Sequence, residues 1–369
     1  MFQYPSEPAL LASPGLYCQA TYEAQLMILT RRRRTVPKLL SSLGRPAPQC
    51  GLGARDQRPE SGDICQPTAA AFEAMAGEAH TIPTAKDWIA ECETFTSRRK
   101  HRLAYRRRGH GSTVLLLHGF PTWSYDYAAV ATDLARDHDV VTLDFLGYGA
   151  SDKPNPYTYS VAESADSVED LLAHLSLSSM DLVIHDFGGI VGQELVDRQL
   201  KGSLPFSISG LTVLNCGIVY SAYRPTLVQR LLNMPMVGRF VAGRITAAKV
   251  RAGLNGVRGK KRLSDDEFAE LWHGISLQEG HKLAHLHIRY NTERVTHHRR
   301  WEAALGAWNG PIQLVWGLSD PVSGKNVLEL ARENLPSASV VELEGVGHFP
   351  QVEAPNAVAR VIREAVKNS

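Results

Sequence analysis

A buried strand that runs directly into an acidic residue and two glycines is the part of this sequence that most clearly indicates catalysis. The apolar run DLVIHD ends at Asp186, and Phe187, Gly188 and Gly189 open a helical pattern. A strand, a sharp turn and a helix form a nucleophile elbow, where small neighbours expose the central side chain. Such elbows usually carry Ser in a G-x-S-x-G setting, but here Asp186 takes that place and Ile184 replaces the first glycine. Alone, this segment leaves open that Asp186 only caps the helix.

Two further polar residues, an acid and then a histidine, follow later strands of the predicted sheet. Asp320 lies in GLSDP, just after the run IQLVWG, and His348 lies in GVGHFP, just after SVVELEG. A nucleophile, then an acid, then a glycine-flanked His is the chain order of triads built on this kind of elbow. We therefore predict that Asp186 is the nucleophile, His348 the general base, and Asp320 the acid that holds the imidazole.

The run HGFPTW follows the strand TVLLLH and adds a predicted oxyanion hole. In a sheet of this kind, the loop here donates one backbone N–H, and the residue after the nucleophile donates the other. The predicted donors are the amides of Phe120 and Phe187. The side chains predicted to surround the pocket are His118, Pro121 and Trp123.

An Asp nucleophile predicts a different reaction from that of Ser. A carboxylate displaces a leaving group from sp³ carbon and forms an alkyl ester on the enzyme. Water activated by His348 would then hydrolyse that ester, with the two amides stabilising the oxyanion. Carbon–oxygen or carbon–halogen cleavage is therefore favoured over ordinary esterase chemistry.

The elements that must position these residues alternate between strands and helices. Short, almost continuous apolar runs are typical of strands buried on both faces, and helical patterns such as 160–175 separate them. This alternation predicts an α/β fold with a mostly parallel, doubly wound sheet, preceded by a β-hairpin in CETFTSRRKHRLAYRRRG. The predicted strand segments are 113–118, 140–145, 181–186, 210–215, 312–317 and 339–345.

The predicted division of the chain has four parts. Residues 1–83 are rich in Pro, Ser, Gly and Ala without period, so we expect disorder there, with a short helix near Tyr22–Leu29. Residues 84–217 and 308–369 form the two parts of the core. Between them, residues 218–307 show helical spacing without a buried strand, which predicts an α-helical lid over the carboxyl ends of the strands.

Composition limits the possible partners and the location. The net charge of +2 and the absence of a basic stripe give no reason to expect nucleic acid. No stretch reaches the roughly 20 apolar residues of a membrane span, and no secretory signal is evident. The five cysteines show neither metal spacing nor a disulfide framework, which favours a reducing, cytoplasmic location. The composition leaves the oligomeric state open.

Several motifs together resemble a known family. HGFPTWSYDY, LDFLGYGASDKP, HDFGG, GLSDP and GHFPQVEAP resemble the epoxide hydrolase and haloalkane dehalogenase branch of the α/β hydrolases. Within it the chain is most similar to the mesoderm-specific transcript proteins, which have similar HGFPTSSYDW and LDFLGFGFSDKP runs. The resemblance extends from about residue 87 to the C-terminus.

The resemblance implies roles for side chains around the pocket. Haloalkane dehalogenases hold halide with a Trp beside the nucleophile and a second Trp or Asn, but these positions are Phe187 and Phe120 here, and neither side chain can donate. Epoxide hydrolases protonate the epoxide oxygen with lid tyrosines. Tyr290, ahead of the Arg-Arg-Trp at 299–301, matches one such tyrosine, and Tyr220 or Tyr223 would be its partner. Epoxide hydrolases usually also carry Trp after the nucleophile, so Phe187 departs from both groups.

The sequence thus favours a cofactor-independent hydrolase that converts a small apolar epoxide to a diol. A haloalkane or haloacid dehalogenase is the alternative, and a catalytically silent ligand-binding protein is the alternative of another class. No metal is expected, because His281, His285 and His287 share a basic helix with no carboxylate beside them.

Overall fold

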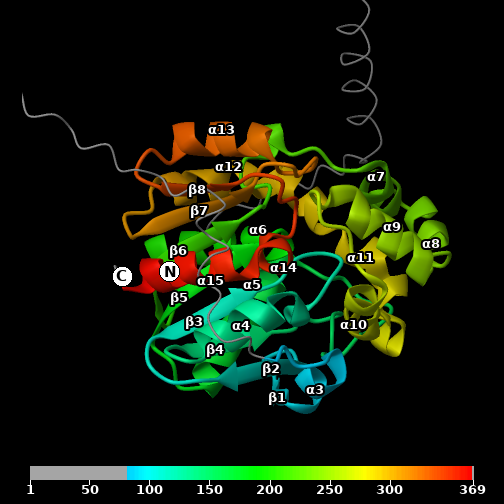
Figure 1. Cartoon of the computed structure of the whole chain (residues 1–369), viewed down its shortest axis with the longest axis horizontal. Coiled ribbons are helices and arrows are strands. Elements are labelled where there is room, and N and C mark those ends of the chain that lie inside the picture. The colour runs from blue at the N-terminus through cyan, green and yellow to red at the C-terminus, as the bar shows by residue number, and fades with distance from the viewer. Residues whose placement is uncertain (1–80, 368–369) are drawn as a thin grey trace, which may run out of the picture. The chain divides into compact units, whose positions relative to one another are not determined.

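The computed structural model describes residues 81–367, which form one β-sheet covered by helices on both faces (Figure 1). The parallel α/β architecture predicted from the alternation of strands and helices is confirmed. The predicted disorder of residues 1–83 and the helix near Tyr22–Leu29 fall almost entirely outside the described residues, so both stay predictions.

The sheet has eight strands in the order β1-β2-β4-β3-β5-β6-β7-β8. β1 and β2 form the predicted hairpin, and β2 also pairs antiparallel with β4. Every other pairing is parallel. The strands are β1 (Glu93–Thr96), β2 (Arg102–Arg108), β3 (Thr113–Leu117), β4 (Asp139–Leu143), β5 (Ser179–His185), β6 (Ser207–Leu214), β7 (Ile312–Gly317) and β8 (Ser339–Leu343).

The central strands are apolar along their length because helices cover both sides of the sheet. In β3, Leu115 and Leu117 belong to the core on one face of the sheet, whereas Val114 and Leu116 belong to the core on the other face. Successive side chains of a strand point to opposite faces, so burial of both faces requires a continuous apolar run.

Helices on each face belong to one of the two cores (Figure 1). On one face lie α5 (Val161–His174), α6 (Phe187–Leu200) and α13 (Lys325–Asn334). On the other lie α3 (Ala85–Ala90), the 3-10 turn η1 (Ser124–Tyr127), α4 (Ala128–Leu134), α14 (Pro350–Glu353) and α15 (Pro355–Val366). Because parallel strands alternate with these helices, the residues after β3, β5, β7 and β8 meet at the same edge of the sheet.

The chain between β6 and β7 is helical, and it holds no strand. Its elements are η2 (Tyr220–Ala222), α7 (Leu227–Asn233), α8 (Val237–Ala242), α9 (Ala247–Val257), α10 (Asp265–Ser276), η3 (Leu277–Leu283), α11 (Ala284–His287) and α12 (Tyr290–Gly306). We call this segment the insertion. The residue boundaries predicted for a lid, 218–307, stay a prediction.

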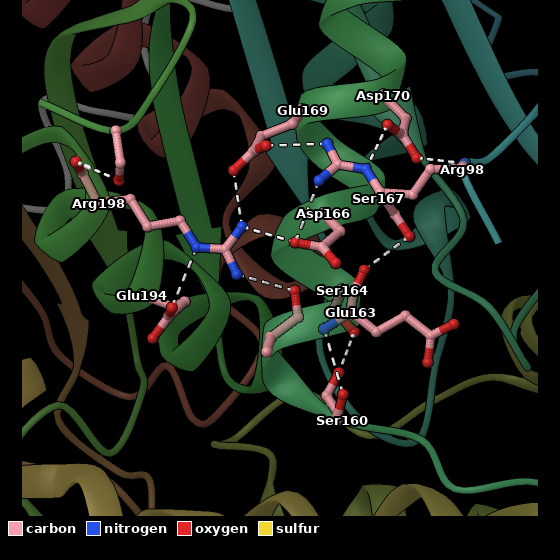
Figure 2. Close-up of polar contacts among 12 residues, drawn as sticks. Arg98, Ser160, Glu163, Ser164, Asp166, Ser167, Glu169, Asp170, Glu194 and Arg198 are labelled. Atoms are coloured by element: carbon pink, nitrogen blue, oxygen red, sulfur yellow. Dashed lines mark hydrogen bonds and ion pairs between the residues drawn. The ribbon is translucent and has the colours of Figure 1, made fainter. Parts of the chain in front are cut away.

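A network of arginines and carboxylates joins α6 to α5 and α5 to the β1–β2 turn (Figure 2). The Arg198 guanidinium donates to Glu194 Oε1 at 3.0 Å within α6, and to Asp166 Oδ1 at 2.8 Å and Glu169 Oε1 at 2.6 Å on α5. Arg98, in the β1–β2 turn, contacts the same α5 carboxylates from the other side. Helix α12 also packs on α6, and its Arg300 and Trp301 donate to Glu194 at 2.5 and 2.7 Å, which ties the insertion's last helix directly to the core.

Candidate active site

Asp186 lies at the turn between β5 and α6 in a conformation that few residues other than glycine adopt. Its φ is 45° and its ψ is −110°. The side chain makes no capping hydrogen bond to α6, which argues against the simple capping role. Close packing leaves room only for glycine nearby: a Cβ on Gly188 would lie 2.5 Å from Leu117 O, and one on Gly119 would lie 2.6 Å from Asp186 Cβ. The turn therefore holds the Asp186 carboxylate rigidly against the end of β3.

The three predicted triad residues meet at the carboxyl edge of the sheet. His348 Nε2 is 3.3 Å from Asp186 Oδ2, and His348 Nδ1 is 2.7 Å from Asp320 Oδ2. All three residues are buried, with at most 5% of each exposed. The imidazole thus lies between two carboxylates, one after β5 and one after β7, although 28 residues separate Asp320 from His348 and many more separate them from Asp186.

These contacts determine the charges of His348 and Asp186. Burial opposes the charged form of His348, but Asp320 foremost, and then Asp186, outweigh it and raise the pKa of His348 to about 10. Burial likewise works against the charged Asp186, but hydrogen bonding and attraction to His348, with the Phe120 amide, hold the pKa of Asp186 below its usual value. The resting site is therefore an ion pair of a carboxylate and an imidazolium.

Asn215, which sequence reasoning missed, positions the acid. It follows β6, is fully buried, and donates from Nδ2 to Asp320 Oδ2 at 3.1 Å. The same amide group bonds both backbone groups of Gly317, at 3.0 and 2.6 Å. Val322 N donates to the other oxygen of Asp320 at 2.7 Å. The Asp320 carboxylate is therefore held from three directions, and a single Asn after a strand gave no sequence signal of this.

His185, beside Asp186, is packed and hydrogen-bonded. Its Nε2 is 2.7 Å from the carbonyl oxygen of His348, and its Nδ1 is 3.1 Å from Gln351 Nε2. Burial, assisted by the charge of His348, lowers the pKa of His185 to about 3, so the ring is neutral. A neutral ring that donates from Nε2 and accepts at Nδ1 satisfies both contacts. His185 thus fixes the loop that carries His348.

One of the two predicted oxyanion donors contacts the carboxylate directly. The Phe120 amide donates to Asp186 Oδ1 at 2.9 Å. For Phe187, the described part of the chain shows no such hydrogen bond to the carboxylate, although the residue follows Asp186 at the start of α6. The rings of Phe120 and Phe187 both pack against Tyr290, with centroids 6.4 and 5.1 Å apart.

The insertion brings two of the three candidate tyrosines to the site. The hydroxyls of Tyr290 and Tyr223 are buried without a hydrogen-bond partner in the described structure. Burial raises the pKa of Tyr223 to about 12 and that of Tyr290 well above its usual value, and the charge of Asp186 adds to both shifts. Tyr220 instead stacks on His298, with ring centroids 4.6 Å apart, and its position gives it no contact with the triad.

A third buried tyrosine, Tyr148, was not among the predicted site residues. Its hydroxyl also lacks a partner within the described residues, and its ring stacks between Phe187 and His287 at centroid distances of 6.2 and 4.3 Å. Burial, with the charge of Asp186, raises the pKa of Tyr148 well above its usual value. The sequence places Tyr148 in a turn between two glycines, which gave no sign of this role.

A narrow cavity of only about 10 Å³ adjoins the elbow. Its walls include Phe187 from the elbow, Tyr148 from the core, and Tyr290 and His287 from the insertion. Burial, with Lys153, lowers the pKa of His287 to about 3, so this wall is uncharged. The larger hollow in the described residues lies near Arg107 and His110, at the opposite end of β2 and β3, and is too far from the triad to serve it.

The three residues predicted to line the pocket pack around the loop that follows β3. His118 is fully buried and accepts from the Phe145 amide at 3.2 Å, so it braces the loop after β4. Trp123 is fully buried against α10: its indole N–H donates to Leu271 O at 3.1 Å. Pro121 is half-buried between them. None of the three is a wall of the narrow cavity beside the elbow.

Residues 81–367 contain no cluster of His, Cys, Asp and Glu that could hold a metal ion. His281, His285 and His287 do not form one. Across the same residues, no helix is long and apolar enough to cross a membrane.

Comparison with known proteins agrees with the fold and the motifs. Residues 112–355 match the family model described as the alpha/beta hydrolase fold. The human mesoderm-specific transcript homolog protein is 39% identical over 255 residues, which cover 67% of this chain and 76% of that protein. This confirms the resemblance that the motifs indicated. A cis-3-alkyl-4-alkyloxetan-2-one decarboxylase from Shewanella oneidensis is 27% identical over 281 residues, covering 73% and 86%. A loop variant of the haloalkane dehalogenase DbeA from Bradyrhizobium elkanii superposes with a TM-score of 0.64 at 22% identity, covering 75% and 96%, which is a likeness of fold.

Proposed function

Because this chain belongs to the α/β-hydrolase fold family, we propose that it is a hydrolase whose nucleophile is Asp186 and whose substrate is a small apolar epoxide, opened to a diol. The observation that supports this most directly is the position of the Asp186 carboxylate. It stands at the elbow in place of Ser, with one oxygen on the Phe120 amide and the other 3.3 Å from His348 Nε2.

In the first step, an Asp186 oxygen attacks an epoxide carbon, and the carbon–oxygen bond of the ring breaks. The leaving alkoxide takes a proton from a buried tyrosine hydroxyl, and Tyr290 and Tyr223 are the candidates because their hydroxyls are buried without a hydrogen-bond partner in the described structure. Alkylation removes the negative charge of Asp186, so the pKa of His348 falls, and its proton returns to the tyrosinate. His348 becomes neutral at the point where a base is needed.

In the second step, neutral His348 takes a proton from water as that water attacks the ester carbon of Asp186. The tetrahedral oxyanion forms at the position of the oxygen that the Phe120 amide already contacts, which favours the transition state by a few kcal/mol per donor. Collapse expels the diol oxygen, which takes the remaining acidic proton, and restores the carboxylate and the imidazolium. The product thus carries one oxygen from Asp186.

A single turnover in H₂¹⁸O tests this sequence of steps. With styrene oxide as substrate, the first diol formed contains no ¹⁸O, and mass spectrometry finds the label in the peptide that holds Asp186. Asp186→Asn abolishes diol formation, and His348→Gln accumulates the ester as a mass increase equal to that of the epoxide. Label that enters the diol directly in the first turnover would contradict a covalent mechanism.

Tyr290→Phe and Tyr223→Phe test the acid. We expect either variant to lower the rate of ring opening by about 10²–10⁴-fold if its hydroxyl donates the proton. Tyr220→Phe is the matched control, because its ring stacks on His298 away from the triad, and it leaves the rate unchanged.

Dehalogenation is the second candidate, supported by the fold shared with haloalkane dehalogenases. The side chains of Phe120 and Phe187 cannot donate a hydrogen bond to a halide, which weighs against it. The relative named for an oxetan-2-one suggests a second strained ring, and a third substrate, for the panel. Measuring diol, halide and alkene from matched epoxide, bromoalkane and oxetan-2-one substrates separates the three reactions.

A catalytically silent ligand-binding protein is the alternative of another class. It predicts that His348→Gln binds these substrates without gaining mass. Failure to trap an ester with every member of the panel would favour that role over both enzymatic ones.

A further inference from the structure

Two helices of the insertion expose an unusual amount of apolar surface. Among residues 81–367, nine large apolar side chains are exposed, and six of these fall within a 14-residue stretch of α7 and α8. They are Leu227, Val228, Met234, Met236, Val237 and Phe240, which we call the α7–α8 patch. Apolar residues exposed singly are ordinary, whereas a cluster of this kind marks an interaction site.

The patch faces outward because the opposite side of α8 packs against α11. Gly238 packs so closely that a Cβ there would lie 3.3 Å from His285 Cβ of α11. Met236, at the tip of the turn between α7 and α8, is 89% exposed, and Phe240 is 59% exposed one helical turn further on. Figure 1 shows α7 and α8 at the margin of the molecule, on the far side of the insertion from the sheet.

The charged residues in the segment that carries the patch have a single sign. Residues 224–249 contain five basic residues and no acidic ones. All five are exposed, and none forms an ion pair within the described part of the chain. They are Arg224, Arg230, Arg239, Arg244 and Lys249. An apolar face with a purely basic rim is typical of segments that lie in the interface of an anionic membrane.

We propose that the α7–α8 patch docks on an anionic phospholipid bilayer, with its apolar side chains at the acyl boundary and its basic rim on the lipid phosphates. A second copy of the chain fits less well, since a two-fold contact would bring two basic rims together without a carboxylate. Residues 1–80 fit no better, because their eight basic and seven acidic residues offer no net negative charge.

Docking in this way places the bilayer one helix away from the cavity. Helix α8 packs on α11, and His287 of α11 is a wall of the cavity beside the elbow. An apolar substrate dissolved in the membrane would then reach the cavity through the insertion. The docking itself requires no catalysis, so the test of vesicle binding is independent of the test of the proposed reaction.

Co-sedimentation of the full chain with large unilamellar vesicles tests the proposal. We expect binding to vesicles of equal parts phosphatidylcholine and phosphatidylserine, weak binding to phosphatidylcholine alone, and loss of binding as salt is raised. Met236→Glu and Phe240→Glu each weaken binding about tenfold or more, and Arg239→Gln with Arg244→Gln weakens it only on the anionic vesicles.

The matched control is Leu200→Glu. Leu200 is 44% exposed at the C-terminus of α6, and it is not part of the α7–α8 patch. It makes the same change from apolar to acidic without touching the patch, so it leaves vesicle binding unchanged. Circular dichroism of each variant verifies the fold.

Three results would overturn the proposal. Equal vesicle binding by wild type, Met236→Glu and Phe240→Glu would show that the patch is not the contact. A wild-type dimer in sedimentation equilibrium that Met236→Glu converts to monomer, with no vesicle binding, would assign the patch to a second copy. Amide protection of α7–α8 in a monomer that ignores vesicles would assign it to another part of the chain.

Discussion

His348 lies between two carboxylates, and this position makes the fold less stable as the pH becomes alkaline. Its pKa is about 10 in the folded chain against an ordinary value of 6.5. A folded pKa above the unfolded one contributes stability that is complete below pH 6.5 and lost as pH rises through about 10. We therefore expect the free energy of unfolding to fall between pH 7 and 10 with a slope of up to about 1.4 kcal/mol per pH unit.

Asp186→Asn removes one of the two carboxylates, so it should flatten this slope and lower the pKa of His348. Urea denaturation across the pH range measures the slope, and NMR titration of the His348 ring measures the pKa. An unchanged titration in the variant would mean that Asp186 does not hold the proton on His348.

Asn215 provides a second test at a single residue. Asn215→Ala leaves the Gly317 backbone groups and one side of Asp320 unpaired in a fully buried place, which costs about 1–3 kcal/mol of stability. Thermal or urea unfolding measures this loss. Asn334→Ala, at an exposed helix end, is the control and should change stability by less than about 0.5 kcal/mol.

At the scale of elements, the close approach of α6 to β3 depends on Gly188. A Cβ on Gly188 would meet the Leu117 carbonyl at 2.5 Å, so Gly188→Ala must shift either the helix or the strand. We expect a loss of stability of roughly 1–3 kcal/mol and the loss of any ester trapped on Asp186. Gly253→Ala makes the same change in α9, where nothing lies within 4 Å of the new Cβ, and should stabilise by about 0.5–1 kcal/mol.

The clamp between α5 and α6 is also testable. Arg198 has a side chain only 17% exposed and contacts three carboxylates, so Arg198→Met removes the cation that they share and leaves them paired with Arg98 and Arg300 (Figure 2). We expect a loss of about 1–3 kcal/mol in the free energy of unfolding. Arg98→Met removes the outer, 46% exposed arginine, and should cost less than about 1 kcal/mol because water screens it. Equal losses in both variants would contradict a buried clamp.

At the scale of the whole molecule, the sheet was predictable because burial on both faces produces continuous apolar runs in the sequence. The run that became β5 is apolar at consecutive positions, and only a strand covered on both sides requires that. The meeting of Asp186, Asp320 and His348 was predictable for a related reason: each follows a strand, and a parallel sheet gathers the carboxyl ends of its strands.

The walls of the site were less predictable, because they depend on how helices pack over the sheet. Tyr220 and Tyr223 are three residues apart, yet only Tyr223 turns inward, and nothing in their local sequence distinguishes them. Tyr148 and His287 stack on each other from segments 139 residues apart, which periodicity cannot show. The cytoplasmic location predicted from the cysteines, and the division of the chain at residues 218 and 307, stay predictions.

The insertion leaves and re-enters the sheet on neighbouring strands. β6 and β7 pair in parallel, with Leu211 opposite Ile312, so the 97 residues between the strands run from the carboxyl end of β6 back to the amino end of β7, only a few residues away along the sheet. The entropy of closing a loop grows only with the logarithm of its length, so a loop about tenfold longer costs roughly 2 kcal/mol more. Over evolution, such a segment can be lengthened, shortened or exchanged while the register of the strands and the positions of the triad are kept, and new specificities can arise without a new fold.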